Sequence, residues 1–383
     1  MDAKTLLDKA MENTRLDDFG DTSFLEAFTI LLRAYKTEAD FNFIGRVCVH
    51  GDTVRTLENR LRVVADRRLH PAIADEVIRR PLFITGLPRS GTTFLHALLA
   101  QDPALRAPLV WEVMHPSPPP ETASYNCDPR IAATAKQLKW LDILMPDFKT
   151  VHLIDARLPQ ECIAITSHDF RSYTFESMYH VPSYRAWHDR QDKRPEYEFH
   201  RHFLQHLQWR APGKRWVLKA PSHLLALDGL LQVYPDACII LTHRDPLKVL
   251  PSCASFTEVL RSAFSDQVDK VSLAQEVKHR WEEGAGLAVK YRQIPGDLQK
   301  QFFDVRYGEL VQEPMAMVRR IYQHFGLELT PDAEVAMQRF LQANPKNKGG
   351  VHRYSLEEFG MNPAEERGRF QFYLDFFGLE PET

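Results

Sequence analysis

The residues best suited to chemistry form a short glycine-rich stretch, FITGLPRSGTTFLH, between Phe83 and His96. A short apolar run leads into Gly86, and Gly91 is followed by two threonines and a helical pattern. A loop between a strand end and a helix start exposes unpaired backbone N–H groups, and the helix dipole adds partial positive charge there. Glycines also let the backbone approach a bound oxygen closely. The stretch therefore predicts an anion site at a helix N-terminus.

The cation of this loop is in an unusual position. In nucleoside-triphosphate loops a lysine directly follows the second glycine and reaches the β- and γ-phosphates. Here Thr92 occupies that position, and the nearest cation is Arg89, two residues before Gly91. The expected strand ends offer no acid to help hold magnesium other than Asp245, and no HExxH-like pair occurs. We expect no metal, and a donor with a short anionic chain that Arg89 faces directly.

A second block that could grip an anion reads ACIILTHRDPLKVLPSCASF. Arg244 follows an apolar run, at the carboxyl end of an expected strand, and ligands of parallel sheets bind at that edge. Asp245 and Pro246 are typical of a helix N-cap and first turn, which places Arg244 just before a helix. We expect Pro251 to kink or end this helix. A surface charge without a ligand is the alternative interpretation of Arg244.

These two blocks resemble those of sulfotransferases that use 3′-phosphoadenylyl sulfate (PAPS) and release adenosine 3′,5′-bisphosphate (PAP). Similarity to bacterial and fungal members also covers VLKAPSHLLALDGLLQVYPDA, Arg15–Phe24 and His352–Gly360, so the resemblance extends over most of the chain. It implies a loop for the 5′-phosphosulfate of the donor and a separate grip on the 3′-phosphate. The donor-binding residues that the resemblance implies are Arg89, Ser90, Gly91, Thr92, Thr93, Arg244 and Ser252.

The resemblance implies further donor contacts toward the C-terminus. Tyr307 resembles a family tyrosine near the adenine, although a core tyrosine fits the pattern equally well. Some sulfotransferases place a basic glycine loop over the 3′-phosphate, and NPKNKGGVHRYS is similar, with Lys346, Lys348, Gly349 and Arg353. An exposed polar loop is the alternative for this segment.

Sulfuryl transfer needs in-line positioning and stabilisation of charge on the leaving oxygen. Arg89 is expected to neutralise the leaving phosphate, and Lys219, at the end of the second strand, to hold the sulfuryl or bridging oxygen. A hydroxyl acceptor also needs a base. The resemblance offers Glu112, in LRAPLVWEVMHP, and His152, in FKTVHLIDARLPQEC. Neutral imidazole suits this work near pH 7, whereas a glutamate needs its pKa raised by burial; the choice stays open.

The acceptor is a small molecule with a hydroxyl group, and its identity cannot be read from the sequence. Aromatic side chains gather between the first two expected strands, where they either line an apolar pocket for a lipid, steroid or phenol or form a core. They are Phe170, Tyr173, Phe175, Tyr179, Tyr184 and Trp187. Two alternative functions stay open: a small-molecule kinase of the phosphate-loop class, and a nucleotide-binding relative without turnover.

Composition limits the cellular setting and the partners. The chain has 383 residues, of which 44% are hydrophobic and 26% charged, and a formal net charge of -3, which argues against a general nucleic-acid surface. Five scattered cysteines without a CxxC pair favour a reducing compartment. The sequence shows neither a signal peptide nor an uncharged apolar run of the roughly 18 residues that a membrane helix needs. We expect a cytoplasmic protein; its oligomeric state is not predictable.

Strands alternating with helices must position these groups. Four short apolar or β-branched runs predict strands at Leu82–Thr85, Trp216–Leu218, Cys238–Thr242 and Phe302–Arg306. Strand-then-helix order predicts an α/β fold with a parallel sheet flanked by helices. We expect one sulfotransferase-like domain over 1–383: a helical extension (1–80), the 5′-phosphosulfate loop unit (81–115), a helical insertion on the acceptor side (116–210), and a 3′-phosphate half with C-terminal loop and helices (211–383).

Overall fold

The computed structural model describes residues 2–144, 154–211, 213, 215–344 and 355–382. The chain groups into two compact units. The helical unit comprises 1–78, 108–212 and 259–268, and the sheet unit comprises 79–107, 213–258 and 269–383. Each unit is thus assembled from segments that are far apart in the sequence.

The sheet unit is built on five parallel strands in the order β2-β3-β1-β4-β5. Their bounds are β1 Leu82–Gly86, β2 Leu105–Arg106, β3 Arg215–Lys219, β4 Cys238–His243 and β5 Phe302–Arg306. All four strands expected from the sequence are present, and the parallel arrangement is confirmed. The two-residue β2 was missed because so short a run carries no periodicity of its own.

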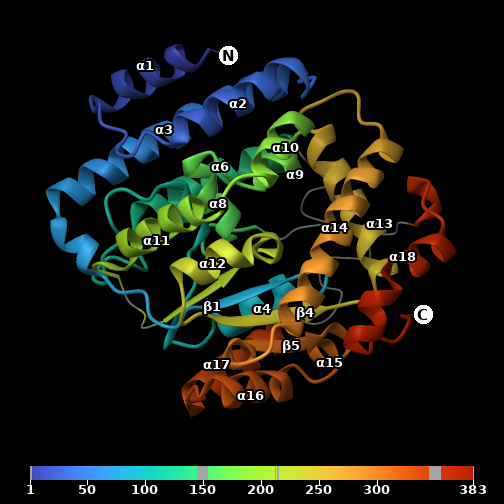
Figure 1. Ribbon diagram of the computed structural model, residues 1–383. Coiled ribbons are helices and arrows are strands. Elements are labelled where there is room, and N and C mark those ends of the chain that lie inside the picture. Colours follow the sequence, from blue (N-terminus) through green and yellow to red (C-terminus); the bar gives the residue numbers. More distant parts are fainter. Residues whose placement is uncertain (1, 145–153, 212, 214, 345–354, 383) are drawn as a thin grey trace. The chain divides into compact units, whose positions relative to one another are not determined.

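Helices cover both faces of this sheet. Side chains alternate across a strand, so Leu82 and Ile84 pack with Leu95 of α4 and Ile321 of α16 in one apolar cluster. Phe83 points to the other face, where its ring lies 5.2 Å from that of Tyr234. Figure 1 shows α16 and α17 on one side of β5 and α12 and α14 on the other side of the sheet. Both faces are therefore buried, which explains why the strands read as nearly continuous apolar runs.

The sheet unit contains these helices: α4 Thr92–Leu99, η3 Pro221–Ala226, α12 Leu227–Val233, α13 Pro246–Ser262 (whose last turn belongs to the helical unit), α14 Lys270–Gln293, η4 Asp297–Gln301, α15 Tyr307–Gln312, α16 Pro314–Phe325, α17 Pro331–Ala343, η5 Glu357–Phe359 and α18 Pro363–Phe377. Figure 1 shows α18 beside α14, and the two helices are in contact.

The helical unit confirms the expected N-terminal extension and insertion. Its helices are α1 Ala3–Thr14, α2 Phe24–Thr37, α3 Phe43–Leu69, η1 Pro71–Asp75, α5 Val110–Met114, α6 Pro129–Leu144, α8 Cys162–Thr166, η2 Ser167–Asp169, α9 Thr174–Met178, α10 Pro182–Asp189 and α11 Arg194–Gln208. Across the part of the chain that the structure describes, no helix combines the length and apolarity that crossing a membrane requires.

Three buried histidines in the helical unit predict a loss of stability in mild acid. Burial lowers the pKa of His168 to about 4, of His200 to about 3 and of His206 to about 4, from an ordinary value of 6.5. At a pH between the lowered pKa and the ordinary value of 6.5, the unfolded chain binds more protons than the folded one. The free energy of unfolding therefore falls as the pH falls below about 6.5. Each histidine should remove on the order of 2 kcal/mol by pH 5.

Urea unfolding between pH 7.5 and pH 5 measures this loss. His200→Leu should flatten the pH dependence, and His50→Leu, at an exposed position, should leave it unchanged. A wild-type protein equally stable at both pH values would contradict neutral burial of these rings.

Candidate functional site

The loop between β1 and α4 is held against its neighbours by two glycines with positive φ. Gly86 has φ +134°, and a Cβ at this residue would lie 2.2 Å from the carbonyl oxygen of Thr242 on β4. Gly91 has φ +89°, and its Cβ would lie 3.0 Å from the Leu310 side chain and 3.1 Å from the Tyr307 ring. Both glycines therefore allow close approach of backbone to a neighbouring element of the fold.

Arg89, the displaced cation, links the two predicted phosphate blocks. Its backbone has φ +61°, a left-handed conformation that is unfavourable for a residue with a side chain and that concentrates at functional sites. Its Nε donates to the Ser252 Oγ at 3.1 Å, and its carbonyl oxygen accepts from Arg244 Nη1 at 2.8 Å. Residues 89, 244 and 252, assigned to one donor from sequence alone, are thus in direct contact.

Arg244 stands immediately after β4 and carries further contacts. Its guanidinium lies over the ring of Tyr307, 4.0 Å from the centroid, and it forms a salt bridge with Glu382. Tyr307 is the first residue of α15 and follows β5, the neighbour of β4. Arg244 is therefore a fixed, partly buried cation beside an aromatic ring and not an isolated surface charge.

Helix α13 begins as predicted but does not end where a proline suggests. Asp245 caps it, because its Oδ1 accepts the Leu247 N–H at 3.0 Å, and Pro246 is its first residue. We expected Pro251 to kink or end the helix; the helix continues through Pro251 to Ser262, so the second of these outcomes, a helix end, is wrong. The buried residues on either side of this proline pack well enough to outweigh the one hydrogen bond that it removes. Ser252 consequently sits in the second turn of a continuous helix.

The remaining loop hydroxyls divide between holding the loop and facing outward. The buried Ser90 hydroxyl bonds to the Leu87 carbonyl and lies 2.6 Å from the Thr242 hydroxyl. Thr92 is buried, whereas Thr93 is exposed and its hydroxyl accepts from Lys219 Nζ at 3.2 Å. Lys219, at the end of β3, is only 2% exposed. An ammonium group is thus buried against the start of α4.

These groups lie where the strand order reverses. β1 is flanked by β3 on one side and β4 on the other, and the chain reaches the two sides in separate excursions. Ligands of open parallel sheets bind outside the carboxyl ends of strands at such a switch point. Arg89, Lys219, Arg244 and Tyr307 all follow or end the strands at this edge.

A buried histidine beside Arg244 was missed by the sequence analysis. His243 Nδ1 bonds to the Tyr373 hydroxyl at 2.8 Å, and its Nε2 to Asp304 at 2.9 Å. Asp304 also pairs with Arg292 at 2.8 Å. Burial lowers the pKa of His243, so the ring is neutral near pH 7 and serves as a fixed support for the strand end. The only sequence signal for His243 is its place in the LTHRDP motif, where a polar residue ends an apolar strand.

The structure describes Glu112, one of the two candidate bases. Glu112 lies in the helical unit, fully buried in α5, and its Oε2 accepts the Leu109 N–H at 2.8 Å. This contact caps the helix start. The other candidate base and the residues of the basic glycine loop lie outside the described part of the chain: His152, Lys346, Lys348, Gly349 and Arg353.

The aromatic residues of the insertion pack against one another in the helical unit. The Phe170 ring lies 4.7 Å from Phe28, and Tyr184 lies 5.7 Å from Phe175 in an edge-on contact. Phe170, Tyr173, Phe175, Tyr179 and Tyr184 are all buried. Of the two interpretations of this cluster, the contacts favour an aromatic core.

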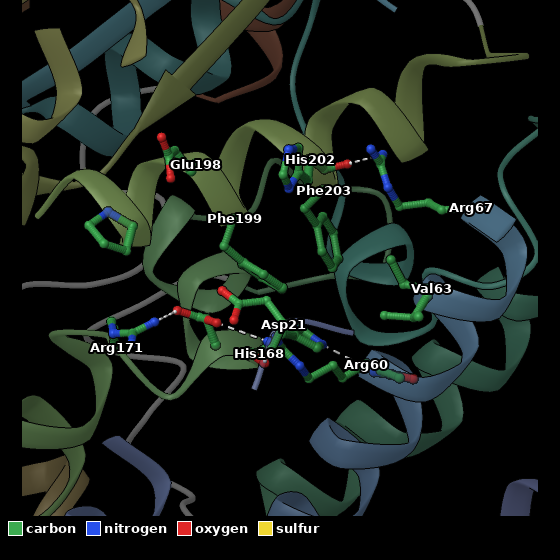
Figure 2. Close-up of a pocket in the computed structure, with 14 residues that line it drawn as sticks. Asp21, Arg60, Val63, Arg67, His168, Arg171, Glu198, Phe199, His202 and Phe203 are labelled. Carbon is green, nitrogen blue, oxygen red and sulfur yellow. Dashed lines mark hydrogen bonds and ion pairs between the residues drawn. The ribbon is translucent and has the colours of Figure 1, made fainter. Parts of the chain in front are cut away.

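A cavity of about 160 Å³ lies within the helical unit, beside α3 and α11. Among its lining residues, Arg60 and Arg171 both donate to the Asp169 carboxylate. Figure 2 shows the Arg67 side chain bonded to the His202 carbonyl. The Arg60 guanidinium donates to four acceptors, the carbonyl oxygens of Phe19, Asp21 and His168 and the Asp169 carboxylate. These charges hold helix α3 to the neighbouring segments, so we assign the network a structural role.

Comparison with known proteins decides the family. A model of the sulfotransferase family matches residues 81–331, about two thirds of the chain. The chain belongs to the sulfotransferase family. As a sulfotransferase it is a transferase of sulfuryl groups, and the small-molecule kinase that the sequence left open is excluded.

The relatives of this sulfotransferase include mycobacterial enzymes. It is 28% identical over 287 residues to the ω-hydroxy-β-dihydromenaquinone-9 sulfotransferase Stf3 of Mycobacterium bovis and of Mycobacterium tuberculosis, covering 70% of this chain and 67% of each relative. The crystal structure of sulfotransferase STF9 from Mycobacterium avium matches with a TM-score of 0.90 and 32% identity, over 99% of this chain and 97% of that one. STF1 from Mycobacterium tuberculosis matches with a TM-score of 0.85 and 31% identity, over 97% and 98%.

The sulfotransferase loop should not tolerate a side chain at Gly86. Gly86→Ala places a Cβ against the Thr242 backbone and imposes an unfavourable φ, so the free energy of unfolding should fall by about 2–4 kcal/mol. Gly308→Ala is the matched control: Gly308 lies in α15 with no atom within 4 Å of an added Cβ. That change should stabilise the protein slightly, since alanine favours helix. Urea unfolding compares both, and equal stability of the two variants would refute the close packing of the loop.

Proposed function

We propose that this sulfotransferase moves a sulfuryl group from PAPS to the hydroxyl of a small apolar acceptor, forming a sulfate ester and releasing PAP. The observation that carries the proposal is the meeting of Arg89, Ser252, Arg244 and Tyr307 at the carboxyl edge of the sheet. Two guanidinium groups, a serine hydroxyl and an aromatic ring suit a nucleotide with two separate phosphates.

The residues present fit this donor in three places. The backbone N–H groups of the loop and α4, with Arg89, would hold the 5′-phosphosulfate. Thr92 and Thr93 belong to the same helix start, and Ser90 acts there through its backbone because its hydroxyl holds the loop. Arg244 and Ser252 would hold the 3′-phosphate, and the Tyr307 ring would lie near the adenine. Lys348 and Gly349 are proposed to cover the 3′-phosphate.

The donor supplies an activated sulfuryl group. As the acceptor oxygen bonds to sulfur, the bond from sulfur to the bridging oxygen of the 5′-phosphate breaks, and the leaving phosphate gains negative charge. Arg89 and the loop N–H groups neutralise that charge, because fixed donors are most effective where charge develops. Lys219, buried beside the start of α4, is proposed to stabilise the sulfuryl or bridging oxygen. No metal is required for this charge balance.

A base must take the proton of the acceptor hydroxyl, and we assign this role to His152. Glu112 already uses one carboxylate oxygen to hold the start of α5. A neutral imidazole accepts a proton near pH 7 without adjustment of its pKa. Glu112 is proposed to position the segment 109–114, whose start it holds.

The acceptor is proposed to be an apolar molecule with a terminal hydroxyl. Support comes from the relatives, whose name specifies an ω-hydroxylated dihydromenaquinone. The chemistry of sulfuryl transfer requires the hydroxyl, because a nucleophilic oxygen is what the acceptor must contribute to the reacting centre.

Replacing Arg244 tests the donor assignment. Arg244→Ala should weaken PAP binding about 30- to 100-fold, as expected for a lost charge-assisted contact, and weaken 5′-AMP binding far less, through the lost contacts with Arg89 and Tyr307 alone. Calorimetric titration of PAP, 5′-AMP and ATP–magnesium measures both effects, and Arg339→Ala, at an exposed position of α17, is the control cation. If the wild-type protein binds ATP–magnesium but not PAP, or if Arg244→Ala loses PAP and 5′-AMP affinity equally, the assignment of Arg244 to a 3′-phosphate is refuted.

The base is tested with His152→Gln and Glu112→Gln. His152→Gln should lower kcat about 10²- to 10⁴-fold for an aliphatic alcohol, and far less for an acidic phenol that ionises without help. Glu112→Gln keeps an oxygen for the Leu109 N–H and should lose much less. PAP affinity, measured in parallel, should stay unchanged in both. A large loss confined to Glu112→Gln would transfer the base role to the glutamate.

A further inference from the structure

The segment after α18 places a carboxylate on the arginine assigned to the 3′-phosphate. Arg244 Nε lies 3.0 Å from Oε1 and 3.1 Å from Oε2 of Glu382, and Nη2 lies 3.0 Å from Oε2. Two guanidinium nitrogens thus face both oxygens of one carboxylate. This is the fork geometry with which arginine binds carboxylates and phosphates alike.

The fold directs this segment to the end of β4. Near the end of α18, the Tyr373 hydroxyl bonds to His243 and the Phe377 ring stacks on it, with centroids 3.8 Å apart. Gly378, with φ +57°, ends the helix, and the Leu379 N–H bonds back to the Leu374 carbonyl. A glycine in this conformation turns the chain sharply at a helix end. The residues that follow are therefore held beside the residue after His243, which is Arg244.

A second contact holds Glu382 at the same place. Its backbone N–H donates to Asp245 Oδ2 at 3.0 Å, on the residue that caps α13, and Arg367 of α18 reaches the same oxygen at 3.3 Å. In contrast, Glu380 and Pro381 are exposed and belong to no helix or strand. The Glu382 carboxylate is thus held on Arg244 by polar contacts, which another anion can replace.

We propose that Glu382 is an intramolecular competitor of the donor's 3′-phosphate, so that the segment 379–382 must leave Arg244 when PAPS or PAP binds. This inference rests on the proposed function, which assigns Arg244 to that phosphate. A phosphate monoester carries about −1.5 to −2 charges at pH 7 and offers three acceptor oxygens, against a single charge and two oxygens for a carboxylate. The phosphate therefore displaces Glu382, whereas a nucleotide without it has no group to do so.

The cost of displacement sets the size of the effect. The two side chains are 17% and 31% exposed, and an ion pair with this much access to water is weak. The short connection to α18 nevertheless keeps the carboxylate at a high effective concentration near Arg244. Apparent affinity falls by the fraction of molecules in which the site is open. A site open in about one molecule in five gives a five-fold weaker apparent affinity for PAP.

Calorimetric titration of the full chain with PAP and 5′-AMP tests the competition. Glu382→Gln should tighten PAP binding about five-fold and leave 5′-AMP binding unchanged, while Glu380→Gln, an identical change of charge on the same segment, should have no effect. Glu382→Lys should tighten PAP at least as much, because like charges keep the segment away from Arg244. In an Arg244→Ala background, Glu382→Gln should change nothing.

The outcomes separate this inference from the proposed function. If wild-type protein binds PAP no better than 5′-AMP, the donor assignment fails and the competition fails with it. If wild-type protein prefers PAP but Glu382→Gln matches Glu380→Gln, the donor site stands and the competition is refuted. A Glu382→Gln variant with a lower melting temperature and unchanged PAP affinity would also refute it, since Glu382 would then only stabilise the fold.

Discussion

The proposed donor site depends on the backbone conformation of Arg89. Its left-handed φ aims the carbonyl oxygen at Arg244 and lets its side chain reach Ser252. A lysine after the second glycine, as in triphosphate loops, would extend from the helix start. Arg89 instead lies inside the turn and contacts Arg244, the residue that follows β4. The strain of this conformation, about 1 kcal/mol or more, is offset by contacts from β4 and α13. One residue therefore couples the loop to the opposite phosphate grip.

Rigidity at the end of β4 supports this coupling. His243 is fixed on both ring nitrogens, by Tyr373 and Asp304, and Asp304 is held in turn by Arg292. Polar side chains in a buried site are stable only when their hydrogen bonds are satisfied, and here the partners come from β5, α14 and α18. Three elements remote in sequence thus fix the position from which Arg244 projects. An arginine with this support loses little further freedom when it binds an anion.

The sequence predicted the sheet and the chemical character of the site because both depend on local signals. Apolar runs identified four strands, and Asp245-Pro246 marked the start of α13 correctly. Long-range contacts were beyond reach: the Arg89–Ser252 bond joins residues 163 apart, and His243 meets Tyr373 across 130 residues. The helix end that Pro251 suggests does not occur: local propensity disfavours proline in a helix, but burial of its neighbours keeps α13 continuous. The contacts of the Ser90 hydroxyl with the Leu87 carbonyl and with Thr242 of β4 were likewise not visible in the sequence.

Charge balance connects the loop, the strand end and the segment after α18. Arg244 donates to the backbone of Arg89, whose own side chain bonds to Ser252, so the site carries two cations. Like charges repel, and an anion beside them lowers that cost. The donor that we propose would supply two phosphates for this purpose, and Glu382 supplies one carboxylate on Arg244. The electrostatic requirement that suits the edge of this sheet to the proposed bisphosphate nucleotide is thus met in this structure by an acidic side chain of the chain itself.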